Sequence, residues 1–535
     1  MRGSLSRVLT DRLVVSTLRD VAATTHPSTL RRSVLELLDA HAAETPDAPA
    51  ASFPAGEHTY AELAASTRRW ARRLLAAGVA PGDRVGILLR EGSETYVSLA
   101  LGAMRIGALV VAVNARNKVR ELDYVIGHSG MRLLVTEPSF TALLAEVDPT
   151  DCRIVVLGSD ALDEAEEVAV EVDRSSHALL LYTSGTTANP KGCLLTHAAL
   201  LAVGENCAER MEAKAADRFW TPLPLFHVGG WQAFMTMLSR GGCFSHAGTF
   251  EATAALDQLE RERVTLAFPA FELIWTAILD HPRFPQADLS ALRMVQNVGT
   301  PERLQSMQER LPHAVQVSCF GSTESGGSIC LGSAHDSLHS RTHTSGKPMP
   351  GVELKVVDEA GRELGPDQPG ELWHRAVSQF DGYYRDPEAT AAAVDADGWF
   401  RTGDLMCWEA DGSIRFIGRL KDQLKVGGEN VSAADIEDYL LTHPAIDVAC
   451  VVGAPDSRYG EVPAAFVRLT PGAGTTEAEL IQFCVGRIAG YKVPRYVRVV
   501  DEFPVTPTAK IQKFVLRDRI AAELRERGIT EAPRF

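Results

Sequence analysis

The stretch Tyr182-Thr-Ser-Gly-Thr-Thr-Ala-Asn-Pro-Lys-Gly192 follows the apolar run 178–181, which predicts a buried strand that ends at a polar loop. The loop sets four hydroxyls around a glycine and is followed by a lysine. These residues are Thr183, Ser184, Gly185, Thr186, Thr187 and Lys191. A glycine-containing loop after a strand offers backbone N–H groups, hydroxyls and an ammonium to phosphate oxygens.

The loop is not the P-loop of kinases and GTPases. That motif needs G-x-x-x-x-G-K-[ST], whereas Pro190 precedes the lysine here and Gly192 follows it. An ordinary solvated turn has a similar composition, so composition alone leaves phosphate binding and a plain turn both open.

The whole composition is that of a globular protein with more than one domain. At 535 residues, with 45% hydrophobic and 23% charged residues, the chain can bury a large core. A formal charge of −15 argues against a nucleic-acid partner, which requires a basic face. Nine cysteines without a C-x-x-C pair fit a reducing, cytoplasmic setting and lack metal-site spacing.

No segment predicts a membrane span. The longest apolar run, residues 99–113, is short and contains Arg105. Residues 1–30 carry several arginines among serines, as transit peptides do, but Asp11 and Asp20 oppose that interpretation. We therefore expect a frayed or helical N-terminal extension.

Helices and strands alternate through the first two thirds of the chain. Two amphipathic helices come first, at 33–45 and 60–77, and a βα series covers 84–136. A second βα series runs from 219 to about 319. This alternation predicts parallel sheets covered by helices, with ligands at the carboxyl ends of the strands. Residues 346–417 instead hold short alternating segments between turns, which predicts a β-rich subdomain.

A separate C-terminal domain is predicted from Lys421. Ser432 and Asp435 have the form of a helix capping box, and strands at 448–452 and 463–469 precede a helix at 477–488. About 115 residues suffice for a small α/β domain. We thus predict an α/β protein with a large N-terminal domain, 1–420, and a small C-terminal α/β domain, 421–535.

The hydroxyl-rich loop resembles the signature of the adenylate-forming superfamily, which includes acyl-CoA synthetases, luciferases and the adenylation domains of peptide synthetases. Their usual pattern is Tyr-Thr-Ser-Gly-Thr-Thr-Gly-x-Pro-Lys-Gly, from which Ala188 departs. The resemblance implies that the loop holds the β- and γ-phosphates of ATP, and that Thr183 also contributes to catalysis and to the metal site.

A second stretch, Phe320-Gly-Ser-Thr-Glu324, resembles the Tyr-Gly-x-Thr-Glu motif of the same superfamily. By resemblance, Glu324 binds Mg²⁺, Thr323 the α-phosphate and Phe320 the adenine face, with Gly321 and Ser322 beside the nucleotide. Mg²⁺ prefers such oxygen ligands. The alternative is a helix N-terminus with an acidic first turn.

Further motifs complete the expected nucleotide and acid sites. Thr402-Gly403-Asp404 and Arg419 resemble the ribose-binding pair of the superfamily. One carboxylate has two acceptor oxygens, which suit two vicinal hydroxyls, whereas Gly-Asp is also common in ordinary turns. Phe416 is expected beside the nucleotide. Val298, Gly299 and Thr300 match the backbone that lines the adenine and acyl sites. His227 resembles a residue in the wall of the acid pocket that positions the acid during catalysis. The other pocket residues expected are Val228, Trp231, Phe271, Val298 and Ser325.

The C-terminal motifs imply that the small domain is mobile. Residues 418–430 resemble the hinge and thiol-tunnel segment, with Lys421 as the pivot. Gly427, Gly428 and Glu429 would approach a pantetheine arm. Residues 504–511 resemble the segment that carries the catalytic lysine, Lys510, although Ala509 replaces the usual glycine.

The resemblance implies a two-step, AMP-forming acid–thiol ligase with ATP, Mg²⁺ and coenzyme A. The acid attacks the α-phosphorus of ATP to give an acyl-adenylate with release of pyrophosphate, and a thiol then displaces AMP. Shared ATP motifs leave other outcomes open: a carrier-protein thiol as acceptor, or nitrite as the acid for diazotisation of an aryl amine. A non-catalytic nucleotide-binding protein is a further alternative, but it would not require Lys510. The acid and the oligomeric state are not predicted.

Overall fold

The structure is a computed structural model that describes residues 33–533 with short gaps. The gaps are residues 91, 149–150, 167–169, 184–189, 427–428, 489 and 506–509. The backbone alone is described at Phe271, Leu273, Lys421, Lys425, Glu429 and Asn430. The predicted extension 1–30 and the predicted contacts of Ser184, Gly185, Thr186, Thr187, Gly427 and Gly428 therefore lie outside the described residues.

The chain forms two compact units. The first comprises Met1–Leu354, His374–Phe400 and Asp411–Ile414, and the second Lys355–Trp373, Arg401–Ala410 and Arg415–Phe535. The division into compact units does not show where a hinge lies, so the domain boundary at Lys421 stays a prediction.

One sheet of the first unit has six strands in the order β6-β5-β3-β4-β7-β8. They are β3 (Arg84–Leu88), β4 (Leu109–Ala112), β5 (Leu133–Thr136), β6 (Arg153–Val156), β7 (His177–Thr183) and β8 (Lys191–Thr196). All neighbours are parallel except β7 and β8, which form an antiparallel hairpin. The connecting helices are α4 (Glu94–Arg105), α5 (Val119–Ser129), η2 (Pro138–Phe140) and α6 (Thr141–Leu144). Every residue of β4 and β5 is buried, which explains their unbroken apolar sequences.

The other large sheet of this unit has seven strands in the order β13-β12-β11-β9-β10-β1-β2. They are β1 (Pro49–Phe53), β2 (Gly56–Thr59), β9 (Arg218–Thr221), β10 (Cys243–His246), β11 (Leu266–Phe271), β12 (Met294–Val298) and β13 (Val315–Val317). All strand pairs are parallel except β1 with β2. The sequence analysis did not predict β1 or β2. The second predicted βα series is confirmed.

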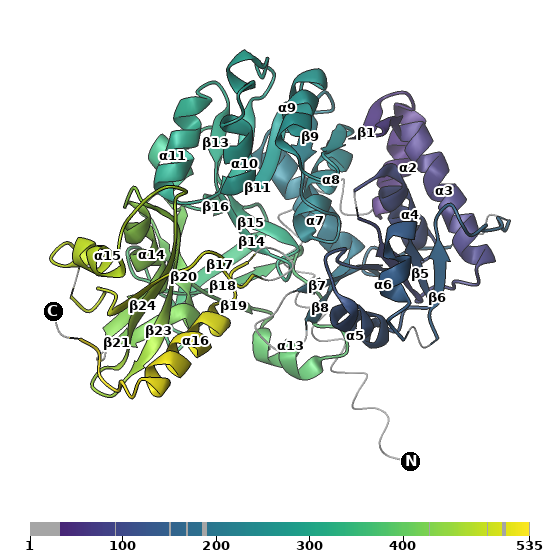
Figure 1. Ribbon diagram of the computed structural model, residues 1–535. Coiled ribbons are helices and arrows are strands. Elements are labelled where there is room, and N and C mark those ends of the chain that lie inside the picture. The colour runs from purple at the N-terminus through teal and green to yellow at the C-terminus, as the bar shows by residue number, and fades with distance from the viewer. Residues whose placement is uncertain are drawn as a thin grey trace. The chain divides into compact units, whose positions relative to one another are not determined.

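Helices accompany both sheets of the first unit, as Figure 1 shows. They are α2 (Val34–Glu44), α3 (Tyr60–Ala76), α7 (His197–Arg210), α8 (Val228–Arg240), α9 (Ala252–Arg261), α10 (Glu272–Leu279), η3 (Phe284–Gln286) and α11 (Pro301–Arg310). α3 packs against α4, and α7 against α8. The largest fully buried side chains of the core are Trp220, Trp231 and Trp275. The predicted helices 33–45 and 60–77 are confirmed, and both begin with capping boxes.

The β-rich region is confirmed, with more elements than predicted. A small sheet contains β14 (Cys319–Ser322), β15 (Gly327–Leu331) and β16 (Lys347–Pro348), and both of its strand pairs are antiparallel. A four-stranded sheet contains β17 (Val352–Val357), β18 (Gly370–Ala376), β19 (Phe400–Trp408) and β20 (Ile414–Arg419) in that order. The additional helices are α12 (Leu338–His343) and α13 (Pro387–Ala393).

The C-terminal part of the second unit is a small α/β fold, as predicted. Its sheet runs β22-β21-β24-β23, with β25 parallel to β24. The elements are η4 (Leu420–Asp422), β21 (Gln423–Val426), β22 (Glu429–Ser432), α14 (Ala433–Leu441), β23 (Ile446–Asp456), β24 (Gly460–Leu469), α15 (Glu477–Cys484), β25 (Tyr496–Val499) and α16 (Lys513–Glu526). Ser432 caps α14 by accepting from the Asp435 N–H.

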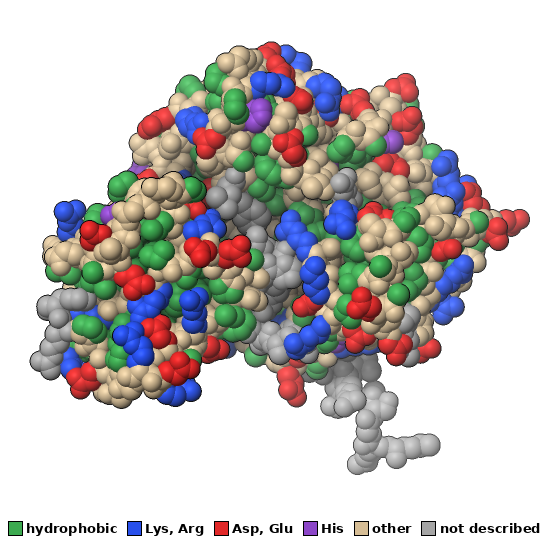
Figure 2. Space-filling view, viewed as in Figure 1, with side chains coloured by type: hydrophobic (Ala, Val, Ile, Leu, Met, Phe, Trp, Pro, Cys, Tyr) green, Lys and Arg blue, Asp and Glu red, His purple; other side chains and the backbone are tan. Residues whose placement is uncertain are grey.

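One face of the molecule carries charged side chains of both signs. On the face shown in Figure 2, Asp and Glu side chains are interspersed with Lys and Arg. Among the described residues, none of the helices has the length and apolar character needed to cross a membrane.

Candidate active site

The β7–β8 hairpin brings together the two ends of the predicted phosphate loop. Thr183 pairs with Lys191 in the strand register, and Tyr182 with Gly192. The Thr183 hydroxyl donates to the Lys191 carbonyl oxygen at 3.4 Å. Both side chains are half-buried. A threonine and a lysine thus stand at the two ends of the loop, and lysine ammonium groups commonly bind phosphate.

Glu324 lies in a tight turn between β14 and β15. The alternative interpretation, a helix N-terminus, is wrong because the chain returns as an antiparallel strand. Gly326 permits this turn: its φ is +74°, and an added Cβ would lie 2.0 Å from the Ser378 carbonyl oxygen. Ser325 closes the turn, since its hydroxyl donates to the Gly327 carbonyl at 2.7 Å and accepts the Ser322 N–H at 2.6 Å.

The expected nucleotide contacts gather around the same turn. Phe320 lies half-buried in β14, Gly321 is exposed, and Ser322 and Thr323 are half-buried. Ser325 is 1% exposed, and its hydroxyl is engaged in the turn. Its predicted role in the acid pocket stays a prediction, whereas its role in shaping the Glu324 turn is visible in these hydrogen bonds.

Tyr383 connects Glu324 with the hairpin, and the sequence did not predict this residue. Its hydroxyl donates to Glu324 Oε1 at 3.0 Å, and the Lys191 ammonium lies 4.7 Å from the centre of its ring. Burial, and then the negative charge of Glu324, raise the pKa of the Tyr383 hydroxyl, so it remains a donor. The structure therefore groups Lys191, Glu324 and Tyr383.

The predicted acid-pocket residues begin at the start of α8. His227 is the N-cap residue, and its backbone N–H donates to the Pro224 carbonyl at 3.0 Å. Its ring lies 4.8 Å from that of Phe226, measured between centroids. Trp231 is fully buried, and its indole N–H donates to the Leu225 carbonyl at 2.6 Å. Trp231 thus fixes the loop that presents His227, while Val228 is half-buried beside it.

A carboxylate that the sequence did not single out lies beside the Val298–Thr300 segment. Val298 is 46% exposed at the end of β12, and Thr300 caps α11. A Cβ on Gly299 would lie 2.8 Å from Glu272 Oε2, and Glu272 pairs with Arg303 at 2.5 Å. Burial raises the pKa of Glu272 despite that arginine. Glu272 directly follows Phe271, whose side chain is not described.

In the second unit, Asp404 and Arg419 form an ion pair. The Arg419 Nε lies 2.7 Å from Asp404 Oδ1. The Asp404 side chain is 3% exposed and that of Arg419 is 44% exposed. The preceding residues hold the carboxylate in place, because the Thr402 hydroxyl donates to the Leu372 carbonyl and accepts the Asp404 N–H. Phe416, in β20, is 43% exposed.

The predicted hinge and lysine segments are described in part. Lys421 belongs to η4, and Glu429 begins β22 opposite Val426. Lys510 is exposed and lies just before α16. The Gln512 N–H donates to the Pro504 carbonyl at 2.8 Å, which closes the loop that carries Lys510. Lys513 anchors the start of α16 through Glu437 at 2.8 Å.

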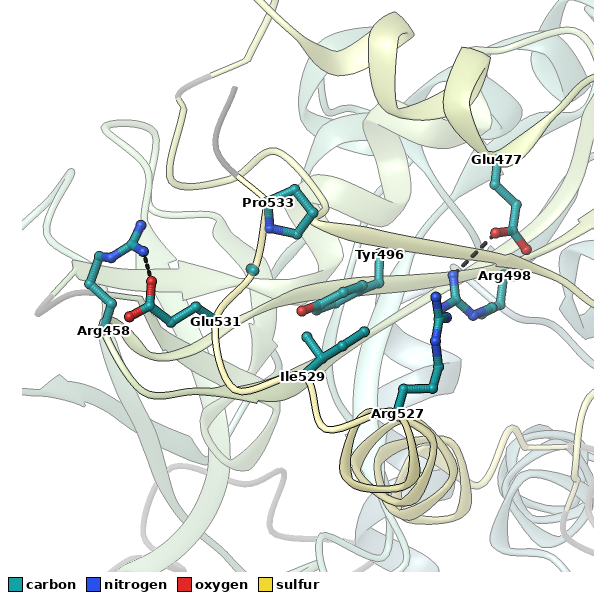
Figure 3. A pocket seen from close by; sticks show the side chains of 9 residues that line it. Arg458, Glu477, Tyr496, Arg498, Arg527, Ile529, Glu531 and Pro533 are labelled. Carbon is teal, nitrogen blue, oxygen red and sulfur yellow. Dashed lines mark hydrogen bonds and ion pairs between the residues drawn. The ribbon is translucent and has the colours of Figure 1, made fainter.

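A separate cavity of about 710 Å³ lies within the second unit, and none of the predicted site residues line it. Tyr496 and Ile529 point into it, as Figure 3 shows. Arg458 pairs with Glu531, and Arg498 with Glu477 at 3.1 Å. Arg527, the third arginine that lines the cavity, pairs with Glu523 at 3.0 Å.

Comparison with known proteins places these residues in a family. The sequence profile described as "AMP-binding enzyme" matches residues 38–384, and "AMP-binding enzyme C-terminal domain" matches residues 435–510. The chain belongs to the AMP-binding enzyme family. This adenylate-forming enzyme is an AMP-forming acid–thiol ligase, as the sequence motifs implied.

Two curated relatives and one solved structure illustrate the similarity. The chain is 34% identical to a feruloyl-CoA synthase of Amycolatopsis sp, covering 86% of this chain and 94% of the relative. It is 32% identical to a fatty acid–[acyl-carrier-protein] ligase of Streptomyces coeruleorubidus, over 91% and 96% of the two chains. The crystal structure of the anthranilate CoA ligase AuaEII in complex with anthranoyl-AMP matches with a TM-score of 0.83 and 26% identity, covering 93% and 98% of the two chains.

The AMP-binding enzyme match ends at Tyr384, and the C-terminal match begins at Asp435. Tyr383 lies inside the first matched range, whereas Asp404 and Arg419 fall between the two. No local sequence signal links Tyr383 to Glu324, because the contact arises when distant segments fold against each other.

Proposed function

We propose that this AMP-binding enzyme uses ATP to convert a carboxylic acid to an acyl-adenylate and then transfers the acyl group to coenzyme A. The observation that carries the proposal is that Tyr383 contacts both Glu324 and Lys191, while Thr183 pairs with Lys191 across the β7–β8 hairpin. A hydroxyl, an ammonium and a carboxylate together can receive a metal–triphosphate complex. The feruloyl-CoA synthase and the anthranilate CoA ligase support the choice of a carboxylic acid and coenzyme A.

The residues fit a magnesium ion. Glu324 and Thr183 offer oxygen ligands, and the remaining positions of Mg²⁺ are normally filled by waters and phosphates. Among the described residues, there is no cluster of three or more His, Cys, Asp or Glu that would hold a metal by itself. The bound ion would neutralise phosphate charge, while Lys191 and the hydroxyls hold the leaving pyrophosphate.

The second unit contains the residues proposed to bind the ribose, and it contains Lys510, which we propose moves into the site. Asp404 would accept hydrogen bonds from the two ribose hydroxyls, and the Arg419 guanidinium lies 2.7 Å from its carboxylate. Lys510 would neutralise charge on the α-phosphate and the acid oxygen as they meet. Phe320 would stack on the adenine.

A carrier-protein thiol is the second candidate acceptor, because one relative of similar coverage is a fatty acid–[acyl-carrier-protein] ligase. Both acceptors are thiols, so the chemistry of the second step is the same. The two candidates differ only in the surface that presents the thiol.

The test is an ATP–pyrophosphate exchange screen across aryl, fatty and amino-substituted carboxylic acids, with nitrite included. We expect exchange with at least one carboxylic acid, followed by thioester formation when coenzyme A is added. Exchange with nitrite but with none of the carboxylic acids would mean that nitrite, and not a carboxylic acid, is the substrate of the first step. Thioester formation with a phosphopantetheinyl carrier protein but not with coenzyme A would favour the second acceptor.

The location proposed for the enzyme is the cytoplasm. All nine cysteines are buried free thiols, which supports a reducing compartment.

A further inference from the structure

The segment that carries Tyr383 is held against β8 by backbone hydrogen bonds. The Tyr384 N–H donates to the Gly192 carbonyl at 2.7 Å, and the Asp381 N–H to the Leu194 carbonyl at 2.8 Å. Cys193 and Tyr383 form a bridge between these two bonds. The backbone of Tyr383 is therefore fixed beside the strand that begins at Lys191.

The same segment also holds the Glu324 turn. The Phe380 N–H donates to the Glu324 carbonyl oxygen at 2.8 Å, and the Tyr383 hydroxyl donates to the Glu324 carboxylate at 3.0 Å. Tyr383 is 9% exposed, so its ring has little freedom to move. Two chemically important groups from different hairpins thus meet one nearly buried aromatic side chain.

We propose that Tyr383 is a positioning residue that sets the Glu324 carboxylate with its hydroxyl and the Lys191 ammonium with its ring. This inference rests on the proposed function, in which Glu324 meets Mg²⁺ and Lys191 meets the phosphates. A glutamate has a broad, poorly defined terminal torsion. The bond to Oε1 selects one orientation and does not occupy Oε2, which can then face the metal.

The ring of Tyr383 acts on Lys191 by a different interaction. A lysine ammonium sits on a flexible four-carbon stem. At 4.7 Å from the ring centre, it lies within the range of a cation–π contact, which restrains the ammonium without using any of its three N–H donors. Those donors stay available to phosphate oxygens.

The neighbouring tyrosine provides a matched control. The Tyr384 hydroxyl donates to the Ser129 carbonyl at 3.2 Å. Tyr384→Phe therefore removes one hydroxyl from the same segment, but from a bond outside the proposed site. Comparing it with Tyr383→Phe separates the specific effect from the general effect of losing a partly buried hydrogen bond.

The experiment measures ATP binding by calorimetry on the full chain, without any acid, at increasing Mg²⁺ and separately in EDTA. For Tyr383→Phe we expect the Mg²⁺ concentration at half-maximal ATP binding to rise about tenfold, since a hydrogen bond to a charged group is lost. Binding in EDTA should stay as in the wild type. Tyr383→Leu, which also removes the ring, should weaken binding in EDTA by about threefold. Tyr384→Phe should match the wild type in both.

Equal magnesium dependence in Tyr383→Phe and Tyr384→Phe overturns the inference. Wild-type protein that binds no ATP under either condition overturns the proposed function itself, so the two failures are distinguishable. Tyr383→Phe keeps the ring and its buried volume, and it carries the test even if Tyr383→Leu does not fold. The double variant Tyr383→Phe/Glu324→Gln should show the same magnesium dependence of ATP binding as Glu324→Gln alone.

Discussion

At the scale of single residues, substitutions in the Asp404–Arg419 ion pair should affect the stability of the protein and its binding of ATP to different extents. Arg419 offsets the charge of a carboxylate that is 3% exposed, but it is itself 44% exposed, so water screens part of the interaction. We expect Arg419→Ala to lower the free energy of unfolding by about 1–2 kcal/mol. Asp404→Asn keeps the shape and removes the charge, so we expect a smaller loss of stability but about tenfold weaker ATP binding.

Urea unfolding and ATP titration measure these two effects on the same preparations. A greater loss of stability in Asp404→Asn than in Arg419→Ala would contradict this account of the ion pair.

His374 predicts a specific pH dependence of stability. Its side chain is fully buried and, within the described part of the chain, neither ring nitrogen has a hydrogen-bond partner. Burial lowers the pKa of His374 to about 3. The unfolded chain, with an ordinary histidine pKa of about 6.5, binds the proton first as the pH falls. Stability attributable to His374 is thus present above pH ~6.5 and is lost progressively toward pH ~3.

His374→Leu should make this decline shallower by up to about 1.4 kcal/mol per pH unit between pH 6.5 and 4.5. Urea unfolding at intervals across this range provides the measurement. His197, whose pKa burial lowers to about 4, retains part of the slope in the variant. Parallel pH profiles for the wild type and His374→Leu would show that His374 does not contribute.

At the scale of elements, the turn between β14 and β15 determines where Glu324 points. Gly326 has φ +74°, and an added Cβ would lie 2.0 Å from the backbone oxygen of Ser378. Gly326→Ala therefore forces the turn to move, and we expect a loss of about 2–4 kcal/mol in stability together with weaker magnesium-dependent ATP binding.

Gly412→Ala is the control for this prediction. Gly412 has φ +80° and nothing within 4 Å of an added Cβ. Gly412→Ala should therefore lower the free energy of unfolding by about 1 kcal/mol, because alanine disfavours this backbone conformation. Thermal unfolding of both variants tests the difference, and equal losses would show that the close approach to Ser378 is unimportant.

Short elements also show where local sequence stops being informative. Residues 84–136 alternate clearly because their strands are buried on both faces and α5 buries only one side. β1 and β2 carry a weak pattern over four or five residues each, and β1 pairs with β10, which lies far along the chain. Their strand character comes from that partner and not from their own composition.

For the whole molecule, the sequence motifs predict most of the proposed site residues but not the residues that hold them in place. Lys191, Glu324, Asp404 and Arg419 each stand in a recognisable motif. The motifs predict that Asp404 and Arg419 both bind the ribose, and the ion pair between these two residues is a finding of the structure. Tyr383 and Glu272 stand in no motif that we recognised. They reach Glu324 and Gly299 only after distant segments pack together, so their contacts depend on tertiary structure.

The two half-reactions place different demands on the enzyme, and Lys510 distinguishes them. Lys510 is exposed on the loop closed by Pro504 and Gln512, next to the helix anchored by Lys513. If its ammonium stabilises charge only while the acid attacks the α-phosphate, Lys510→Ala should lower adenylate formation by about 10²–10³-fold. Thioester formation from a supplied acyl-adenylate should change by less than about threefold, because AMP is then displaced by a thiol without the pyrophosphate leaving group.

Lys492→Ala is the matched control, since that lysine pairs with Asp435 at 2.6 Å in the same unit and has no proposed role in either step. Pyrophosphate release and thioester formation from synthetic adenylate are measured on each variant. Equal loss of both half-reactions in Lys510→Ala would mean that the lysine supports nucleotide binding in general. The prediction that Lys510 acts only in adenylate formation would then be wrong. Loss of the first step alone, with Lys492→Ala active in both, is the result that a lysine dedicated to adenylation requires.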